Sequence, residues 1–95
     1  MGSRRFAEFE ADARARGFDE IVERRWAPGT VLESHAHPFA VEALVIEGEM
    51  WLVSSDGERH LSPGESFSVP RDAPHGERYG AAGTTVWVAR RHTRS

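Results

Sequence analysis

Closely spaced turn signals constrain this 95-residue chain more than any other feature of its sequence. From residue 27 onward, Pro, Gly and Asp-Gly signals recur roughly every 6–10 residues, with short runs rich in β-branched and aromatic residues between them. The signals are Ala27-Pro28-Gly29, Pro38, Gly48, Ser55-Asp56-Gly57-Glu58, Pro63-Gly64, Pro70 and the loop 80–83. Asp56-Gly57 is the pair that a tight hairpin turn favours. The spacing predicts about eight or nine short strands in an all-β sandwich or barrel.

The N-terminal stretch differs from the rest because its apolar residues recur at helical spacing. Phe6, Phe9 and Ala13 form one stripe, Ser3 can cap the helix and Gly17 can end it. We expect a helix within residues 1–17 that packs on the outside of the following part, a β domain over residues 18–92, and a frayed tail over residues 93–95.

The composition excludes several kinds of chemistry. The chain has no cysteine, which excludes disulfides, thiolate metal sites and cysteine nucleophiles, and it has no lysine, which excludes Schiff bases and a P-loop. The net charge of −3 gives no general attraction for nucleic acid. No apolar run is long enough to cross a bilayer, and no signal peptide is recognisable. We therefore expect a cytoplasmic protein that binds neither nucleic acid nor membrane.

The residues with the clearest chemical meaning lie between Gly29 and Gly48. His35 and His37 are separated by one residue, so on a strand they point to the same face. Pro38 ends that strand, and Glu42 begins the next apolar run, where it can return beside the histidines. Two imidazole nitrogens and a carboxylate oxygen suit a divalent first-row metal. On its own, a His-x-His pair on a strand is more often an ordinary half-buried pair.

The segment from Gly29 to Tyr79 resembles two motifs of the cupin superfamily. The first motif runs Gly, five residues, His-x-His, three or four residues, Glu, six residues, Gly. This chain follows it through Glu42, but Gly48 comes one residue early. The second motif runs Gly, five residues, Pro-x-Gly, two residues, His, three residues, Asn. This chain keeps Gly64, Pro70 and His75, with Asp72 in place of the glycine and Tyr79 in place of the asparagine.

The resemblance implies a small jelly-roll (cupin) β-barrel preceded by a short N-terminal helix. It also implies that His35, His37, Glu42 and His75 hold one divalent metal per chain, which would be Fe, Mn, Ni or Zn. His60 and His92 fall outside the pattern, and we interpret them as surface histidines.

A metal inside the barrel would lie beside a mostly apolar small-molecule cavity, lined by residues on the same strand faces as the ligands. By this count the cavity residues are Val31, Leu44, Ile46, Met50, Leu52, Phe67, Glu77 and Trp87. Glu33 and Tyr79 are candidate catalytic residues. Glu33 could act as a base or as a hydrogen-bond partner of a ligand histidine, or it could be a carboxylate at the barrel rim paired with Arg24 or Arg90. Tyr79 could act as an acid, or its phenol could only pack against its neighbours.

Three functions fit this pattern. The first is a metal-dependent enzyme, dioxygenase-like or isomerase-like, that acts on a small molecule. The second is a non-catalytic domain that binds or senses a metabolite or metal. In the third, the metal only holds a small barrel together. Exposed strand edges also favour a C2 homodimer.

Overall fold

A computed structural model describes residues 5–92, and it confirms the predicted all-β architecture with one short N-terminal helix. The described elements are α1 (Phe6–Ala15), β1 (Glu20–Trp26), β2 (Val31–His35), β3 (Ala40–Glu47), β4 (Met50–Ser54), β5 (Gly57–Leu61), β6 (Ser66–Val69), β7 (His75–Tyr79) and β8 (Thr84–Arg91). The turns between them fall at the Pro and Gly signals of the sequence. The predicted tail over residues 93–95 lies outside the described part.

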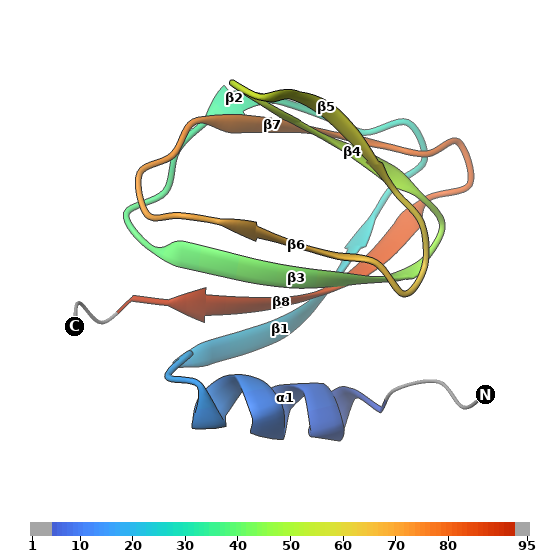
Figure 1. The fold of residues 1–95 in the computed structure, drawn as a ribbon. Helices are drawn as coiled ribbons and strands as arrows, with labels where there is room; N and C mark the ends of the chain where they lie inside the picture. Colours follow the sequence, from blue (N-terminus) through green and yellow to red (C-terminus); the bar gives the residue numbers. More distant parts are fainter. Residues whose placement is uncertain (1–4, 93–95) are drawn as a thin grey trace.

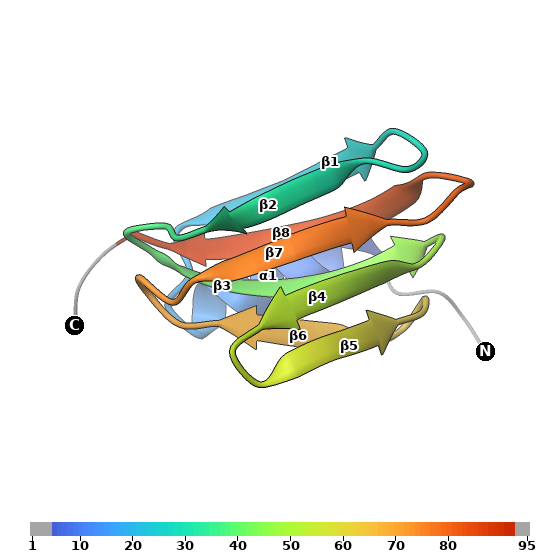
Figure 2. The ribbon, with the colours of Figure 1, turned by 90° about the horizontal axis from the view of Figure 1, so that it is seen from above.

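The strands form two four-stranded antiparallel sheets that face each other (Figures 1 and 2). One sheet has the order β1-β8-β3-β6 and the other has the order β2-β7-β4-β5. Most consecutive strands lie in different sheets, and within the described residues 5–92 only β4 and β5 form a hairpin between neighbours in the chain. This is the double-sheet arrangement of a jelly roll. Within residues 5–92 no strand pairing joins the two sheets, so the predicted barrel is a two-sheet sandwich.

The space between the sheets holds the larger of two apolar clusters. Inward-facing side chains from both sheets fill it, and Val45, Met50 and Leu61 are fully buried. The other buried members are Ala43, Leu52, Phe67, Val69, Tyr79 and Val86. Because side chains alternate along each strand, the same strands present a second set to the outside.

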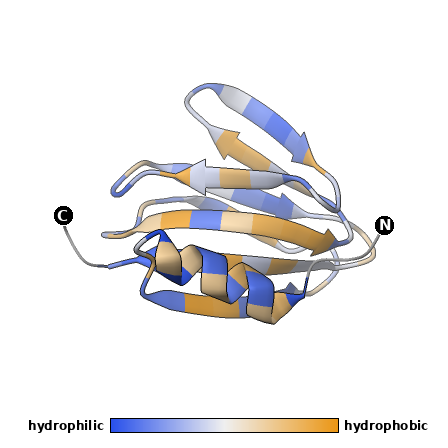
Figure 3. Cartoon of the chain, turned by 60° about the horizontal axis from the view of Figure 1, so that its bottom comes forward, coloured by the Kyte–Doolittle hydropathy of each residue, from blue (hydrophilic) through white to orange (hydrophobic). Residues whose placement is uncertain are grey.

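Helix α1 covers the outer face of the β1-β8-β3-β6 sheet (Figure 1). The helix alternates apolar and polar residues (Figure 3), and Phe9 and Ala13 are its buried members. Their partners on the sheet are Ile21, Leu44, Ile46, Trp87 and Ala89. Leu44, Ile46 and Trp87, which we predicted to line the cavity, therefore belong to the helix interface instead.

Local hydrogen bonds define both ends of α1. The residue at the N-cap is Arg5, whose backbone N–H donates to the Glu8 carboxylate. The predicted cap, Ser3, lies outside the described residues. At the other end Phe18 N–H donates to the Ala13 carbonyl, which is the bond that closes a helix at a following glycine. Among residues 5–92 no helix has the length and apolar character needed to cross a bilayer.

Gly48 makes the tight passage from β3 to β4. Its φ is +78°, and a Cβ at this position would lie 2.1 Å from the Gly83 carbonyl oxygen. Only glycine fits there, because the β3–β4 turn packs directly on the backbone of the β7–β8 turn.

Candidate metal centre

Three imidazoles converge at one end of the space between the sheets. His35 is the last residue of β2, His37 follows it in the β2–β3 loop, and His75 is the first residue of β7. One ring nitrogen from each lies within 4.8 Å of those of the other two. His35 and His75 are direct partners across the β2–β7 ladder, with ring centroids 4.4 Å apart. The sequence placed these three residues in one site from motif spacing, and the structure brings them together.

A bulge in β2 turns His35 toward the inside. Leu32 pairs with Glu77 and His35 pairs with His75, so β2 spans this interval with one residue more than β7 does. Both Leu32 and His35 line the cavity, although strict alternation would put them on opposite faces. The bulged backbone presses on Gly76, where a Cβ would lie 3.1 Å from the Leu32 carbonyl oxygen.

The loop before His75 is tied to the loop that carries His37. Asp72 N–H donates to the His37 carbonyl oxygen over 2.8 Å. Asp72 has a φ of 65°, the left-handed conformation that the motif normally assigns to glycine and that Asp tolerates better than most residues. The two separate motifs are therefore joined by a backbone hydrogen bond beside the imidazoles.

Backbone carbonyls fix which nitrogen of two of the imidazoles is free. His35 Nδ1 lies 2.7 Å from the Glu33 carbonyl oxygen, and His75 Nδ1 lies 3.1 Å from the Ala73 carbonyl oxygen. A carbonyl oxygen only accepts, so each Nδ1 carries a proton and Nε2 is the nitrogen that can bind a metal. Burial lowers the pKa of His37, and the neighbouring His35 and His75 lower it further. A neutral imidazole is the form that binds a metal ion, so this lowered pKa favours His37 as a ligand.

Glu77 brings a carboxylate to the same place. Its Oε2 lies 3.2 Å from His75 Nε2, and its other oxygen accepts a hydrogen bond from the Tyr79 hydroxyl. Two donor atoms bound to one ion at about 2.0–2.2 Å lie roughly 3–3.5 Å apart, so this separation fits a cation bound by both. Burial raises the pKa of Tyr79, and the charge of Glu77 raises it further. Tyr79 is therefore a neutral donor that orients Glu77.

Glu42 does not join the three histidines. Strand β3 points it toward the helix side of the sheet, where its carboxylate forms an ion pair with Arg16 just after α1. The predicted ligand set is corrected here, and the sequence contained the signal. The motif requires six residues between the Glu and the Gly, and six residues between that position and Gly48 give Val41 rather than Glu42; Val41 lines the cavity.

The cavity beside the imidazoles has a volume of about 130 Å³. Of the predicted lining residues, Phe67 and Glu77 face it, as does Tyr79, while Met50 and Leu52 lie in the core between the sheets. Sequence reasoning missed several further lining residues: Arg24, Trp26, Leu32, Phe39, Val41 and Arg90.

Two predicted residues lie outside this cavity altogether. Val31 and Glu33 line a groove on the outer face of the other sheet, and Val31 is 60% exposed. Glu33 contributes only its backbone carbonyl to the site, through the bond to His35. The bulge explains the difference. Val31 and Glu33 would share a face with His35 on a regular strand, but the extra residue puts them on the opposite face.

The two remaining histidines are exposed, as predicted. His60 lies 2.7 Å from Glu49 and His92 lies 2.6 Å from Glu20. Neither belongs to the imidazole cluster.

Comparison with known proteins agrees with this geometry. The family model described as "Cupin domain" matches residues 22–89. A solved RmlC-like cupin from Shewanella frigidimarina NCIMB 400 is 25% identical, with 79% of this chain and 67% of that chain covered and a TM-score of 0.69. The polyketide cyclase RemF from Streptomyces resistomycificus is 30% identical, with 85% of this chain covered and a TM-score of 0.67. This chain spans only 61% of the length of RemF.

A comparison with curated proteins found no match. The family match extends from β1 to β8 and includes all three converging histidines, the Gly48 turn and the loop before His75. The chain belongs to the cupin family.

Proposed function

We propose that this cupin holds one divalent metal through His35, His37 and His75 and acts as a metal-dependent enzyme on a small molecule in the adjoining cavity. One observation carries the proposal. Three imidazoles converge within 4.8 Å at the wall of a largely apolar cavity. Sites of this shape, with a few convergent polar groups, are typical of small-molecule binding.

The donor set suits Fe(II), Mn(II), Ni(II) or Zn(II), since imidazole binds all four. When bound, such a metal acts as a Lewis acid on a substrate oxygen. Glu77 is the carboxylate beside this centre, and its Oε2 is placed to share the ion or to accept a proton from a bound substrate. Tyr79 holds its own proton on the hydroxyl and keeps Glu77 in position. The similarity to a polyketide cyclase supports an enzymatic role.

A metal titration tests the first half of the proposal. Purified protein is stripped with a chelator, titrated with each of the four metals and analysed for metal content. We expect one ion per chain for the wild type, a large loss of affinity for His37→Ala, and no change for His60→Ala, which is a matched surface histidine. Equal affinity in the wild type and His37→Ala would reject the centre.

A product search tests the second half. The loaded protein is incubated with small phenolic and dicarbonyl compounds while oxygen uptake and product masses are measured. Metal-dependent turnover that Glu77→Gln reduces is the expected result. Turnover that is unchanged in metal-free protein would contradict the proposal.

A second candidate is a non-catalytic domain that binds or senses a metabolite or metal. It is favoured by Val41, which leaves an apolar wall where the family motif has a carboxylate. Thermal stabilisation by a metabolite, with no product formed by any loaded form, would support this alternative over the enzyme.

We also propose a C2 homodimer through the outer face of the β2-β7-β4-β5 sheet. The described residues leave this face without a covering helix, and Val31 and Val53 are 60% and 42% exposed on it. Sedimentation that shows only monomer at high concentration, or a dimer unaffected by Val31→Glu, would reject this surface.

A further inference from the structure

Arg24 places a positive charge at the cavity without an acidic partner. It lies on β1 and lines the cavity, and among residues 5–92 it has neither an ion pair nor a hydrogen bond. Its guanidinium lies over the Trp26 ring, 4.4 Å from the centroid. The donors of an arginine that is held flat in this way remain available to a ligand.

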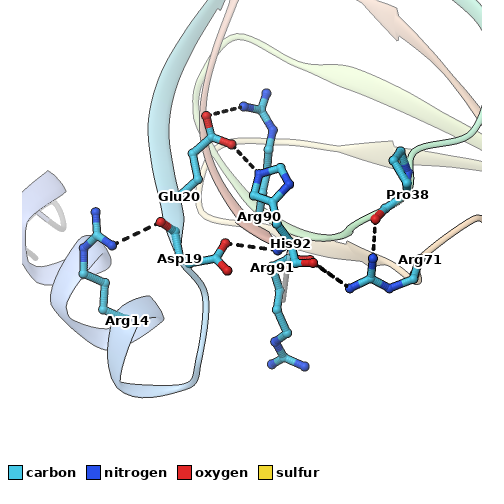
Figure 4. Close-up of polar contacts among 8 residues, drawn as sticks. All are labelled: Arg14, Asp19, Glu20, Pro38, Arg71, Arg90, Arg91 and His92. Atoms are coloured by element: carbon cyan, nitrogen blue, oxygen red, sulfur yellow. Dashed lines mark hydrogen bonds and ion pairs between the residues drawn. The ribbon is translucent and has the colours of Figure 1, made fainter. Parts of the chain in front are cut away.

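The neighbouring arginines are neutralised. Arg90, the other arginine at the cavity, lies 3.3 Å from Glu20, which also binds His92 (Figure 4). Arg25 is next to Arg24 in the chain but lies outside this cavity and pairs with Glu23 at 2.9 Å. Arg24 is thus distinguished by its missing partner, and Arg25 provides a matched control.

Arg24 lies beside a stacked pair of aromatic rings. The Trp26 ring stacks on the Tyr79 ring with centroids 4.8 Å apart and an angle of 13° between the planes, and both residues line the cavity. The charge of Arg24 reaches this pair, because it opposes the rise in the pKa of Tyr79 that burial and Glu77 produce. A ligand in the cavity would meet the edges of the stacked rings next to the guanidinium.

We infer that the cavity takes a small planar carboxylate, with the face of its ring against the edges of Trp26 and Tyr79 and its carboxylate on the guanidinium of Arg24. The inference rests on the proposed function, because it names the substrate class of the same site. The volume of about 130 Å³ limits the ligand to a single small ring or a short conjugated acid. A guanidinium binds a carboxylate through two parallel hydrogen bonds, which favours an acid over its amide.

The test compares benzoate with benzamide, which share a ring and differ in charge. Binding to the wild type, Arg24→Gln and Arg25→Gln is measured by calorimetry and by the indole NMR signal of Trp26, at low ionic strength. Metal-free protein is used first, because a bound metal would itself attract the acid. We expect the wild type to prefer benzoate and Arg24→Gln to lose about tenfold or more of that affinity, as for other hydrogen bonds to charged groups. Arg25→Gln should behave as the wild type.

Arg24 and Arg25 are both exposed, so neither substitution should prevent folding, and thermal unfolding of each variant checks this. Equal binding of benzoate and benzamide, no binding of either, or an equal loss in Arg25→Gln would overturn the inference. Metal content is measured in parallel. A benzoate preference in a protein that binds no metal would support the role of Arg24 while rejecting the proposed metal function. Normal metal binding without a preference for benzoate would support the proposed metal function while rejecting the role of Arg24.

Discussion

The two faces of the β1-β8-β3-β6 sheet are built from the same strands but have opposite characters. On the face under α1, Trp87 and Ala89 pack with the helix in a closed apolar cluster. On the other face of β8, Val86, Val88 and Arg90 line the cavity beside the imidazoles. Because side chains alternate along β8, one of its faces packs against the helix and the other lines the cavity.

This difference shows that stability and chemistry rest on different side chains of the same backbone. The helix face buries large apolar groups, and the Trp87 indole donates to Glu23 over 3.0 Å. The cavity face keeps charged and titratable groups and leaves space unfilled. Substitutions on the two faces should therefore affect different measurements.

The largest effect is expected for Trp87→Ala on the helix face. Trp87 is 6% exposed and contacts the rings of Phe6 and Phe9, so its removal leaves a large cavity. We expect a loss of about 3–5 kcal/mol in the free energy of unfolding, measured by chemical denaturation. Metal stoichiometry should be unchanged under conditions where the variant is folded. Trp51→Ala is the control, because Trp51 is only half-buried on the other sheet and should cost less.

The next effect is expected for Val41→Glu on the cavity face, which restores a carboxylate separated from Gly48 by the six residues that the motif requires. An unpaired carboxylate there should lower the stability of metal-free protein by about 1–3 kcal/mol. Added metal should recover this loss, because the new carboxylate can bind it. Thermal unfolding with and without metal measures both quantities. A variant that metal fails to stabilise would show that Val41 does not face the centre.

A smaller effect is expected from Tyr79, the only tyrosine of the chain. Burial raises its pKa in the folded state, so the folded protein keeps the phenol proton after the unfolded chain has lost it. The stability from this group is complete below about pH 10 and falls above it, by about 1.4 kcal/mol per pH unit. Absorbance at alkaline pH should show no phenolate until the protein unfolds. Phenolate formation in folded protein near pH 10 would contradict the burial of Tyr79.

The smallest effect is expected for Glu42→Gln. Its ion pair with Arg16 is partly exposed, so its loss should cost no more than about 1 kcal/mol. Metal affinity should equal that of the wild type, whereas Glu77→Gln should lower it. A tenfold loss of affinity in Glu42→Gln would restore Glu42 as a ligand and reject the face assigned to β3.

Local turn chemistry made the strands and the three histidines predictable. Asp56-Gly57 and Pro63-Gly64 mark turns that depend on only a few neighbouring residues. His75 was predicted because its distances from Gly64 and Pro70 are properties of a single loop. The fold class followed from the same short-range signals.

The faces of β2 and β3 were not predicted, because they depend on pairing with distant strands. The bulge before His35 arises from the register with β7, and no residue of β2 marks it. It reversed the expected directions of Val31 and Glu33. The motif allows three or four residues between His37 and the Glu, and the choice of four selected Glu42 instead of Val41. A shift of one residue moves a side chain to the opposite face of a strand.

The bulge in β2 has a second consequence at the boundary of the molecule. Strand β2 is an outer strand of its sheet, with β7 on only one side. A regular outer strand offers a row of free amides and carbonyls to which another chain can add, and an extra residue interrupts that row. The irregularity that presents His35 to the interior therefore also discourages fibre-like stacking of one copy on the next along this edge.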